Sequence, residues 1–234
     1  MTGPPGARRP PTEVHSFPVA VGTSLGTARQ VSENVLVETV TFTALADSIR
    51  ARRLEDDRRC LVVGVDGMSG AGKTSFAHRL STELSVPCIG SDEMVSGWDG
   101  LAASLEALVT WVLDPLARGE PGRWRRFDWV EGRPAEWIEV PALDLLVIEG
   151  CCVGVPPVGD HLSYLVWLDT PEAERRRRLA ARDDWDSYAP YFDIWKAQES
   201  ALQAGARTED RADLVVDNTE PVVDTWSGGQ FVRR

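Results

Sequence analysis

The chain has 234 residues, of which 25 are lysine or arginine and 36 are aspartate or glutamate, giving a formal net charge of −11. Apolar residues make up 43% of the chain, which is enough to bury a sizeable core and excludes wholesale disorder. Broad electrostatic binding of nucleic acid or of an anionic membrane requires a basic face. The acidic balance therefore predicts that the protein binds neither.

Membrane insertion and secretion are both disfavoured by the sequence. No apolar run approaches the roughly 18 residues that a membrane span requires. The N-terminal residues include Arg8 and Arg9 but lack the apolar core of a signal peptide. The four cysteines have neither C-x-x-C spacing nor the density of a disulfide framework. We expect a cytoplasmic protein with reduced thiols.

The two ends of the chain differ in composition from its middle. Residues 1–33 are rich in Pro, Gly, Thr and Ser and lack sustained periodicity, which is typical of a flexible extension. Residues 220–234 include Pro, Ser and Gly and are predicted to form a tail outside the core. One domain is therefore expected over residues 34–219, a length that suits a single α/β unit.

Between these ends, short apolar runs alternate with segments of helical periodicity. The run Cys60–Val65 is continuously apolar, as is typical of a strand buried on both faces. Further strands are expected at Val86–Ser91, Leu143–Glu149, Tyr164–Asp169 and Leu214–Asp217, and helices at Thr41–Leu54, Ser75–Leu84, Leu101–Arg118, Pro171–Arg182 and Tyr188–Ala204. This alternation predicts a three-layer α/β fold, in which helices flank both faces of a parallel sheet.

A glycine-rich loop joins the first of these apolar strands to the next helix. It fits the P-loop pattern G-x-x-x-x-G-K-[ST]. In such a loop successive backbone N–H groups point inward at a phosphate, and the following helix adds its positive N-terminal end. The motif predicts binding of a nucleoside triphosphate through Gly67, Met68, Ser69, Gly70, Ala71, Gly72, Lys73, Thr74 and Ser75. The absence of the guanine-binding signature N-K-x-D disfavours a switch GTPase.

The chain between about Cys60 and Asn218 resembles the uridine kinase branch of the P-loop kinases, and within it the uridine-kinase-like ATP-binding proteins of actinobacteria. An ordered series of segments carries the similarity: Asp66–Thr74, Ser91–Val95, Gly97–Leu101, Arg125–Trp129, Ile148–Gly150, Asp169–Asp183 and Ala212–Asp217. The resemblance implies a P-loop NTPase fold of the nucleoside and nucleotide kinase type. It further implies that ATP and Mg²⁺ are the cofactors and that a small-molecule hydroxyl accepts the phosphoryl group.

A kinase that acts on a hydroxyl needs a carboxylate near the acceptor oxygen. Asp92 follows a predicted strand, at the edge of the sheet where ligands bind in open α/β folds. It also matches the catalytic aspartate of the uridine kinase family. The adjacent Glu93 is an alternative base, and a turn or helix-capping role for Asp92 is the competing interpretation.

Two groups are expected to act with the P-loop on the phosphates. Lys73 suits a bridge between β- and γ-phosphate oxygens. Thr74 and Glu149, which ends an otherwise apolar strand, suit Mg²⁺ or its bound waters. The alternative is that Glu149 simply meets solvent at the end of its strand.

Positive side chains are also needed over the charge that develops during transfer. Arg175, Arg178 and Arg182 share one face of the predicted helix that follows Asp169. We favour Arg178 and Arg182 as the residues that close over the phosphates. One lid arginine of uridine kinases is replaced here by Leu179, so this clamp differs from that of the family.

The acceptor site is predicted to combine flat apolar faces with charged groups, a mixture that suits a ring carrying hydroxyls. Its candidate residues are Asp92, Glu93, Trp98, Arg126, Phe127, Asp128, Trp129 and Arg133. The competing interpretation is that the tryptophans are half-buried packing residues. Val95 and Phe127 stand where the uridine kinase family has tyrosines, which disfavours uridine or cytidine as the substrate.

Three functions are compatible with these residues. The first is an ATP- and Mg²⁺-dependent kinase that phosphorylates a hydroxyl of a nucleoside or nucleoside-like molecule. The second is a kinase for another acceptor, such as a cofactor precursor, an antibiotic or a nucleoside monophosphate. The third is a nucleotide-binding regulatory protein without turnover. Uridine kinases often form oligomers, but no heptad or apolar stripe in this sequence requires a homo-oligomer.

Overall fold

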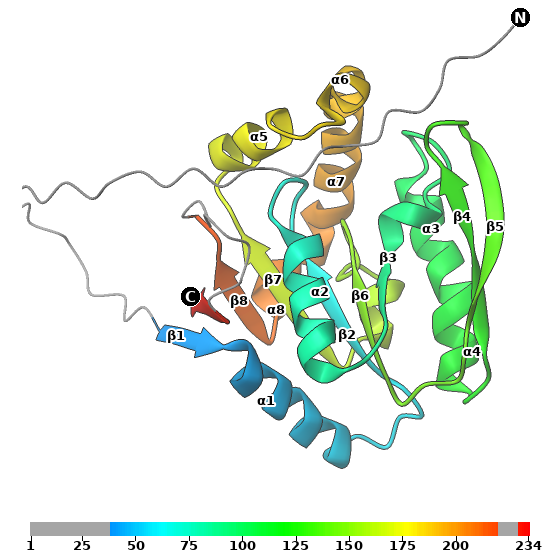
Figure 1. Cartoon of the computed structure of the whole chain (residues 1–234), viewed down its shortest axis with the longest axis vertical. Helices are drawn as coiled ribbons and strands as arrows, with labels where there is room; N and C mark the ends of the chain where they lie inside the picture. Colours follow the sequence, from blue (N-terminus) through cyan, green and yellow to red (C-terminus); the bar gives the residue numbers. More distant parts are fainter. Residues whose placement is uncertain (1–37, 220–228) are drawn as a thin grey trace, which may run out of the picture. The chain divides into compact units, whose positions relative to one another are not determined.

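The computed structural model describes residues 38–219 and 229–234 (Figure 1). The predicted extension 1–33 and residues 220–228 of the predicted tail lie outside these ranges. The strands are β1 (Glu38–Thr41), β2 (Leu61–Asp66), β3 (Cys88–Gly90), β4 (Gly122–Asp128), β5 (Arg133–Val140), β6 (Leu145–Glu149), β7 (Tyr164–Asp169), β8 (Leu214–Asp217) and β9 (Gln230–Arg233). The helices are α1 (Phe42–Glu55), α2 (Lys73–Leu84), α3 (Leu101–Leu108), α4 (Asp114–Ala117), α5 (Glu172–Ala180), α6 (Trp185–Tyr188), α7 (Phe192–Ala206) and α8 (Thr208–Arg211). Within the described residues, none of these helices combines the length and the apolarity needed to cross a membrane.

Seven of the strands form one mixed sheet in the order β1-β9-β8-β7-β2-β6-β3. The five strands from β8 to β3 run parallel, whereas β9 pairs antiparallel with both β1 and β8. Every residue of the central strand β2 is buried, as its unbroken apolar run predicts for a strand covered on both faces. The α/β fold predicted from the alternation of strands and helices is confirmed.

Helices cover both faces of this sheet, and each face has its own core. On one face, α1 and α2 contribute Ile49 and Phe76 to a core that includes the apolar side chains of β2, β7 and β8. On the other face, α3 and α7 contribute Leu105 and Trp195 to a second core, which also holds Val62 of β2. The central strand is thus packed between two helical layers, as the sequence pattern indicates.

The parallel strands bring three predicted site segments to one edge of the sheet. Val65 near the end of β2 pairs with Glu149 at the end of β6, and Gly90 at the end of β3 pairs with the same Glu149. The P-loop leaves β2 here, and Asp92 follows β3 by two residues. This carboxyl edge is where open α/β sheets bind their ligands.

The predicted helices are confirmed, with one irregular turn inside a helix and one later start. The segment Leu101–Arg118 is one helical run, in which α3 passes through a π-helical turn at Val109–Leu113 into α4. The predicted helix Tyr188–Ala204 begins later, at Phe192, because Tyr188 ends α6. A short 3-10 turn that contains Pro190 separates α6 from α7.

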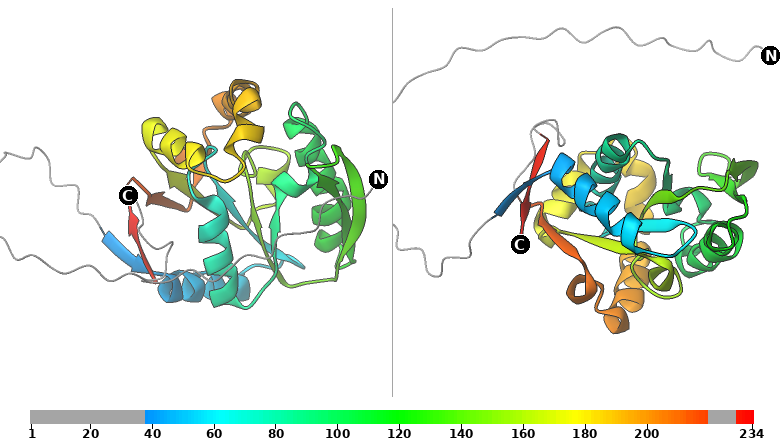
Figure 2. Two further views of the ribbon diagram at one scale, coloured as in Figure 1. Left: turned by 45° about the horizontal axis from the view of Figure 1, so that its top comes forward. Right: turned by 90° about the horizontal axis from the view of Figure 1, so that it is seen from below.

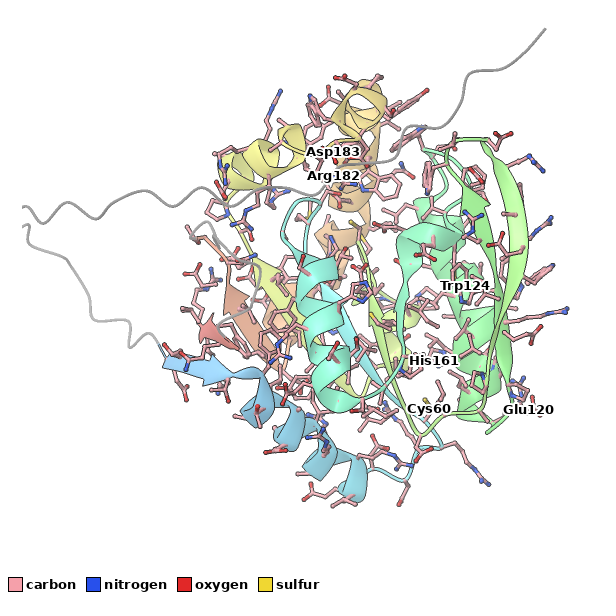
Figure 3. All side chains as sticks on the ribbon, viewed as in Figure 1. Cys60, Glu120, Trp124, His161, Arg182 and Asp183 are labelled. Atoms are coloured by element: carbon pink, nitrogen blue, oxygen red, sulfur yellow. The ribbon has the colours of Figure 1, made fainter. Side chains whose placement is uncertain are left out.

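The hairpin of β4 and β5 was not predicted from the sequence. It forms a separate two-stranded sheet on the side of the unit opposite β1 and β9 (Figure 2). Along β4 buried and exposed residues alternate, and Trp124, labelled in Figure 3, is buried in the same core as α3. Most of β5 is exposed, so its sequence lacks the apolar alternation that marks a strand.

The prediction that the last residues lie outside the core is wrong for Gln230–Arg233. These residues form β9, which joins the sheet between β1 and β8. Phe231 is 3% exposed, and its ring lies 5.2 Å from that of Phe42 and 5.3 Å from that of Phe76, measured between centroids. A four-residue strand in which the apolar residues Phe231 and Val232 lie between Gln230 and Arg233 is too short to give a periodicity from which to predict it.

We expect Phe231→Ala to lower the free energy of unfolding by about 3–5 kcal/mol, because it leaves a cavity beside two aromatic rings. Chemical denaturation followed by circular dichroism measures this. Gln230→Ala, at an exposed position of the same strand, serves as the control and should change stability by less than about 0.5 kcal/mol. A loss below about 1 kcal/mol for Phe231→Ala would show that β9 does not pack on the core.

Candidate active site

The loop between β2 and α2 is shaped to hold an anion. Gly72 caps the N-terminus of α2 with φ of 94°, a left-handed conformation that side chains disfavour. A Cβ at Gly72 would also lie 2.7 Å from the Asn218 amide nitrogen, which donates a hydrogen bond to the Ala71 carbonyl. The first backbone N–H groups of α2 have no acceptor within the helix and carry its positive end. The loop therefore has a geometry that could hold a phosphate group.

Lys73 begins α2 and is only 6% exposed. Its ammonium group donates to the Met68 carbonyl oxygen at 3.3 Å and to the Cys151 sulfur at 3.2 Å. Burial opposes the positive charge, but the neighbouring groups Cys151, Glu199 and Asp92 raise the pKa of Lys73 above its ordinary value. Lys73 is therefore a cation held in a fixed place beside the loop.

A cavity of about 590 Å³ opens over the P-loop, a size typical of ligand sites. Of the predicted nucleotide-binding residues, it is lined by Ser69, Gly70, Gly72, Lys73, Thr74 and Ser75. The rest of its lining comprises Asp92, Cys151, Arg177, Arg178, Leu179, Arg182 and Asn218. Gly67, Met68 and Ala71 are not among the lining residues, and Ala71 is buried in the core beneath α2.

Thr74 and Glu149, the predicted metal ligands, lie in direct contact. The Thr74 hydroxyl donates to Glu149 Oε1 at 3.1 Å. The other carboxylate oxygen, Oε2, is buried with no hydrogen-bond partner in the part of the chain that the structure describes. Burial raises the pKa of Glu149 to about 7, and the charge of Asp92 adds to this shift. Glu149 therefore does not simply meet solvent, and its second oxygen has coordination capacity to spare.

Asp92 lies in a short 3-10 turn, Ser91–Met94, directly after β3. Gly150, which follows β6, allows this turn to approach the P-loop side of the sheet. A Cβ at Gly150 would lie 1.8 Å from the Ser91 hydroxyl oxygen, so no residue with a side chain fits there. The carboxylate of Asp92 is thus placed by the close packing of two strand ends.

The electrostatic surroundings of Asp92 combine opposing effects. Its side chain is open to the cavity yet enclosed by protein on its other sides, and this desolvation raises its pKa. Glu199 raises the pKa further, whereas Lys73 and Arg182 lower it. A carboxylate in such a place is a stronger proton acceptor than one in water, and the two cations favour its ionised form.

A second cavity, of about 580 Å³, adjoins the first and shares Ser69, Asp92 and Arg182 with it. The rest of its lining is mainly aromatic: Trp98, Trp129, Tyr188 and Trp195, together with Val130, Asp184 and Ser187. The predicted acceptor residues Trp98 and Trp129 therefore face a cavity that reaches Asp92. Their rings also pack on one another, with centroids 4.6 Å apart, so packing and cavity lining are combined in the same side chains.

Glu93, Arg126, Phe127, Asp128 and Arg133 were predicted to bind the acceptor, but they are not among the residues lining the second cavity. Arg126 instead donates two hydrogen bonds to Glu136 across the β4–β5 hairpin, at 2.7 and 3.1 Å. Asp128 accepts hydrogen bonds from the backbone at the turn of the hairpin. Glu93 lines a smaller cavity of about 230 Å³ beside Glu149. Arg126 and Asp128 thus stabilise the hairpin.

Arg178 and Arg182, the two arginines expected over the phosphates, both line the first cavity. Arg178 pairs with Glu174 at 2.7 Å and donates to the Asn218 carbonyl oxygen at 2.7 Å. Arg182, labelled in Figure 3, follows α5 and pairs with Asp184. Both guanidinium groups are held by carboxylates at the rim of the cavity.

Arg175 does not line either large cavity, although it shares a predicted helix face with Arg178. Its guanidinium group donates to the Ser69 carbonyl oxygen at 3.1 Å and to the Thr170 carbonyl oxygen at 3.1 Å. Arg175 thus ties α5 to the P-loop backbone.

Sequence reasoning missed Tyr188, Trp195 and Asn218, which line these cavities, and Glu199, which contacts Ser69 of the P-loop. Asn218 directly follows β8, so the same strand-end argument that selected Asp92 could have found it. Tyr188 and Trp195 are seven residues apart, a spacing that would place them on one face of the predicted helix. Glu199 gave no signal, because an acidic residue within a helix usually faces solvent.

The fold class follows from the order of strand, glycine-rich loop and helix, in which the strand β2 belongs to the parallel part of the sheet. The chain has an α/β P-loop NTPase fold. No protein-family model and no curated protein matches its sequence. It is similar to a solved structure of a possible uridine kinase from Bacillus stearothermophilus, with 20% identity and a TM-score of 0.49, over 73% of this chain and 98% of that one. A sugar kinase from a Janibacter species has 18% identity and a TM-score of 0.42, over 69% of this chain and 87% of that one. The function is therefore inferred from the site itself.

Proposed function

We propose that the protein is an ATP- and Mg²⁺-dependent kinase that transfers the γ-phosphoryl group to a hydroxyl of a nucleoside-like small molecule. The observation that carries this proposal is the position of Asp92, which lines both the cavity over the P-loop and the aromatic cavity. A triphosphate held by the loop and Lys73 presents its terminal group in the first cavity. An alcohol in the second cavity then meets that group beside one carboxylate.

Asp92 serves as the general base in this proposal. The acceptor hydroxyl gives its proton to Asp92 while its oxygen bonds to the γ-phosphorus, and the bond from that phosphorus to the bridging oxygen of ADP breaks. The raised pKa of Asp92 suits a group that must take up a proton. Glu93 is the less suitable base because it lines neither large cavity.

Thr74 and Glu149 would hold the Mg²⁺ ion. Their hydroxyl and carboxylate oxygens are the ligands that Mg²⁺ prefers, and the buried Oε2 of Glu149 lacks any other partner among the described residues. When bound, the ion neutralises charge on the β- and γ-phosphate oxygens. Magnesium commonly keeps water and phosphate ligands besides one or two carboxylates, so a larger protein cage is not required.

Lys73, Arg178 and Arg182 would stabilise the charge that develops on the transferred group. All three line the first cavity, and Arg182 also lines the second. Arg178 and Arg182 are paired with carboxylates, so an incoming phosphate must compete with Glu174 and Asp184 for them. This competition favours a ligand with the high negative charge of a triphosphate.

The aromatic cavity favours an acceptor that carries no negative charge. Among its described lining residues Asp92 and Asp184 are acidic, and Arg182 is the one cation. Because Arg182 is paired with Asp184, little positive charge remains for a phosphorylated acceptor. Flat rings of Trp98 and Trp129 suit a cyclic compound. A neutral nucleoside-like alcohol therefore fits better than a nucleoside monophosphate.

A panel of acceptors tests this function directly. Purified protein with ATP and Mg²⁺ is mixed with nucleosides, nucleoside monophosphates, sugars and amino alcohols, and ADP release is compared with the acceptor-free background. We expect uncharged cyclic alcohols to raise the rate at least about tenfold, with a phosphorylated product seen by mass spectrometry. If the whole panel leaves the rate at background, the kinase proposal fails and a regulatory nucleotide-binding role gains support.

Trp98→Ala is expected to raise the KM for the acceptor by about tenfold while leaving the KM for ATP unchanged. The Trp98 ring lines the aromatic cavity but not the cavity over the P-loop. Steady-state kinetics with each substrate varied in turn measure the effect. Trp111→Ala, at a tryptophan that lines neither of these cavities, is the matched control. An equal rise in both KM values would contradict the assignment of Trp98 to the acceptor side.

A further inference from the structure

A carboxylate that the proposed mechanism does not use is buried against the P-loop. Glu199 lies on α7 and is 1% exposed. Its Oε1 accepts two hydrogen bonds from Ser69, one from the backbone N–H at 2.9 Å and one from the hydroxyl at 2.9 Å. Burying a charge beside a phosphate site is costly, because both desolvation and repulsion oppose it. The hydrogen bonds that Glu199 accepts must therefore offset this cost.

Ser69 occupies the place where the two large cavities meet, since it lines both. Its carbonyl oxygen is held from the other side by Arg175, which donates to it at 3.1 Å. Its hydroxyl also lies 3.4 Å from the Cys151 sulfur, beside the ammonium group of Lys73. The backbone and the side chain of Ser69 are thus fixed from α5 and from α7 together.

The same helix contacts the site at two further points. Gln203, one turn after Glu199, donates to Asp66 at 3.1 Å, where β2 ends and the P-loop begins. Gln198 donates to the Trp98 carbonyl oxygen at 2.7 Å, in the wall of the aromatic cavity. Helix α7 therefore connects the start of the P-loop, its centre and the acceptor side.

We propose that Glu199 is a positioning residue, which acts through Ser69 to hold the P-loop at the correct distance from the acceptor cavity. This inference rests on the proposed function, because its effect is on the alignment of phosphate and alcohol. In the proposed function the nucleotide is held by the amides of Gly72 to Ser75, at the start of α2, whereas the hydrogen bonds of Glu199 go to Ser69. Loss of the Glu199 contacts therefore lowers kcat and leaves nucleotide affinity nearly unchanged.

Substitution of Glu199 by glutamine or methionine separates the hydrogen bonds from the charge. Both bonds end on one oxygen, so the amide oxygen of Glu199→Gln can accept both without the negative charge. Glu199→Met is similar in length but accepts neither bond. We expect Glu199→Met to lower kcat by about 10²-fold, and Glu199→Gln to keep it within about threefold. The Kd for a non-hydrolysable ATP analogue should change by less than about threefold in both variants.

A second measurement does not depend on turnover. Amide hydrogen exchange at Ser69, followed by NMR in the nucleotide-free protein, should be about tenfold faster in Glu199→Met and close to wild type in Glu199→Gln. Exchange at core amides of β2 verifies that each variant is folded. Asp193→Asn, at an exposed acidic residue of the same helix, is the control and should match the wild type in every assay.

The outcomes distinguish this inference from the proposed function. If the wild-type protein phosphorylates no acceptor, the proposed function fails, and the exchange rates alone decide whether Glu199 holds Ser69. Unchanged exchange at Ser69 in Glu199→Met overturns the inference. It is equally overturned if both Glu199 variants lose kcat to the same extent, because the charge would then matter and the hydrogen bonds would not.

Discussion

Replacing Lys73 by methionine is expected to lower the rate of phosphoryl transfer by about 10³-fold, the loss typical of removing a preorganised charge from the transferred group. Lys73 is buried under the loop and is held by the Met68 carbonyl oxygen and the Cys151 sulfur. Among the described residues, Arg175 is tied to the Ser69 carbonyl oxygen, and Arg178 and Arg182 are paired with Glu174 and Asp184, so each of these cations already has a partner. Single-turnover transfer with the best acceptor of the panel measures the loss.

The sequence supplies a matched control for this variant. The chain contains one other lysine, Lys196, which lies on α7 and pairs with Glu172 at the surface. Lys196→Met removes the same charge and adds the same side chain, and we expect it to transfer phosphate at the wild-type rate. Equal losses in the two variants would show that Lys73 has no special place at the phosphates.

Asp92→Asn should lower kcat by about 10²–10⁴-fold while the protein still binds ATP, because the amide keeps the shape of the carboxylate but cannot accept the proton. The variant also removes a negative charge that acts on Lys73 and Glu149. Nucleotide affinity should therefore be equal to or higher than that of the wild type. Isothermal titration with an ATP analogue, together with the transfer assay, tests both parts.

Glu93→Gln is the control for Asp92→Asn and tests which of the two neighbouring acids is the base. Glu93 lines only the smaller cavity beside Glu149, so its loss should change kcat by less than about threefold. If Glu93→Gln abolishes transfer and Asp92→Asn does not, the roles assigned to these residues are reversed. If both variants retain the wild-type rate, neither carboxylate is the general base.

The phosphate side of the site was predictable from the sequence because its residues are close together along the chain. The P-loop, Lys73 and Thr74 form one sequence motif, and the spacing of that motif predicts how these residues are arranged in space. Glu149 and Asp92 each follow an apolar run, so the rule that strand ends meet at one edge brings them to the loop. The register of β3, β2 and β6 bears this out, since Val65 and Gly90 both pair with Glu149.

The acceptor side was less predictable, because the sequence does not show which charged side chains pair with one another in the folded protein. Arg126 and Asp128 looked like substrate contacts, but the β4–β5 hairpin pairs Arg126 with Glu136 and uses Asp128 in its turn. That pairing depends on the register of two strands, one of which is largely exposed. The aromatic wall joins Trp98 to Trp195, nearly a hundred residues later, and such long-range contacts leave no local pattern.

The burial of Phe231 and that of Glu199 could not be predicted either, because each depends on contacts with residues that are distant in the sequence. Phe231 and Val232 are the two apolar residues of the four-residue strand β9, and the pairing of β9 with β1 and β8 places Phe231 against the core. From the sequence, Glu199 would be predicted to face solvent, as acidic residues on helices usually do. It is buried because the P-loop offers two donors of Ser69 to the same face of α7.

The central claim is that the P-loop cavity and the aromatic cavity meet at Asp92, so that donor and acceptor face one carboxylate. A crystal structure with a non-hydrolysable ATP analogue, Mg²⁺ and the best acceptor of the panel tests it most directly. The account predicts the terminal phosphate in contact with Lys73 and the acceptor hydroxyl within hydrogen-bond distance of the Asp92 carboxylate. A triphosphate bound away from the loop, or an acceptor whose hydroxyl lies far from Asp92, would contradict it.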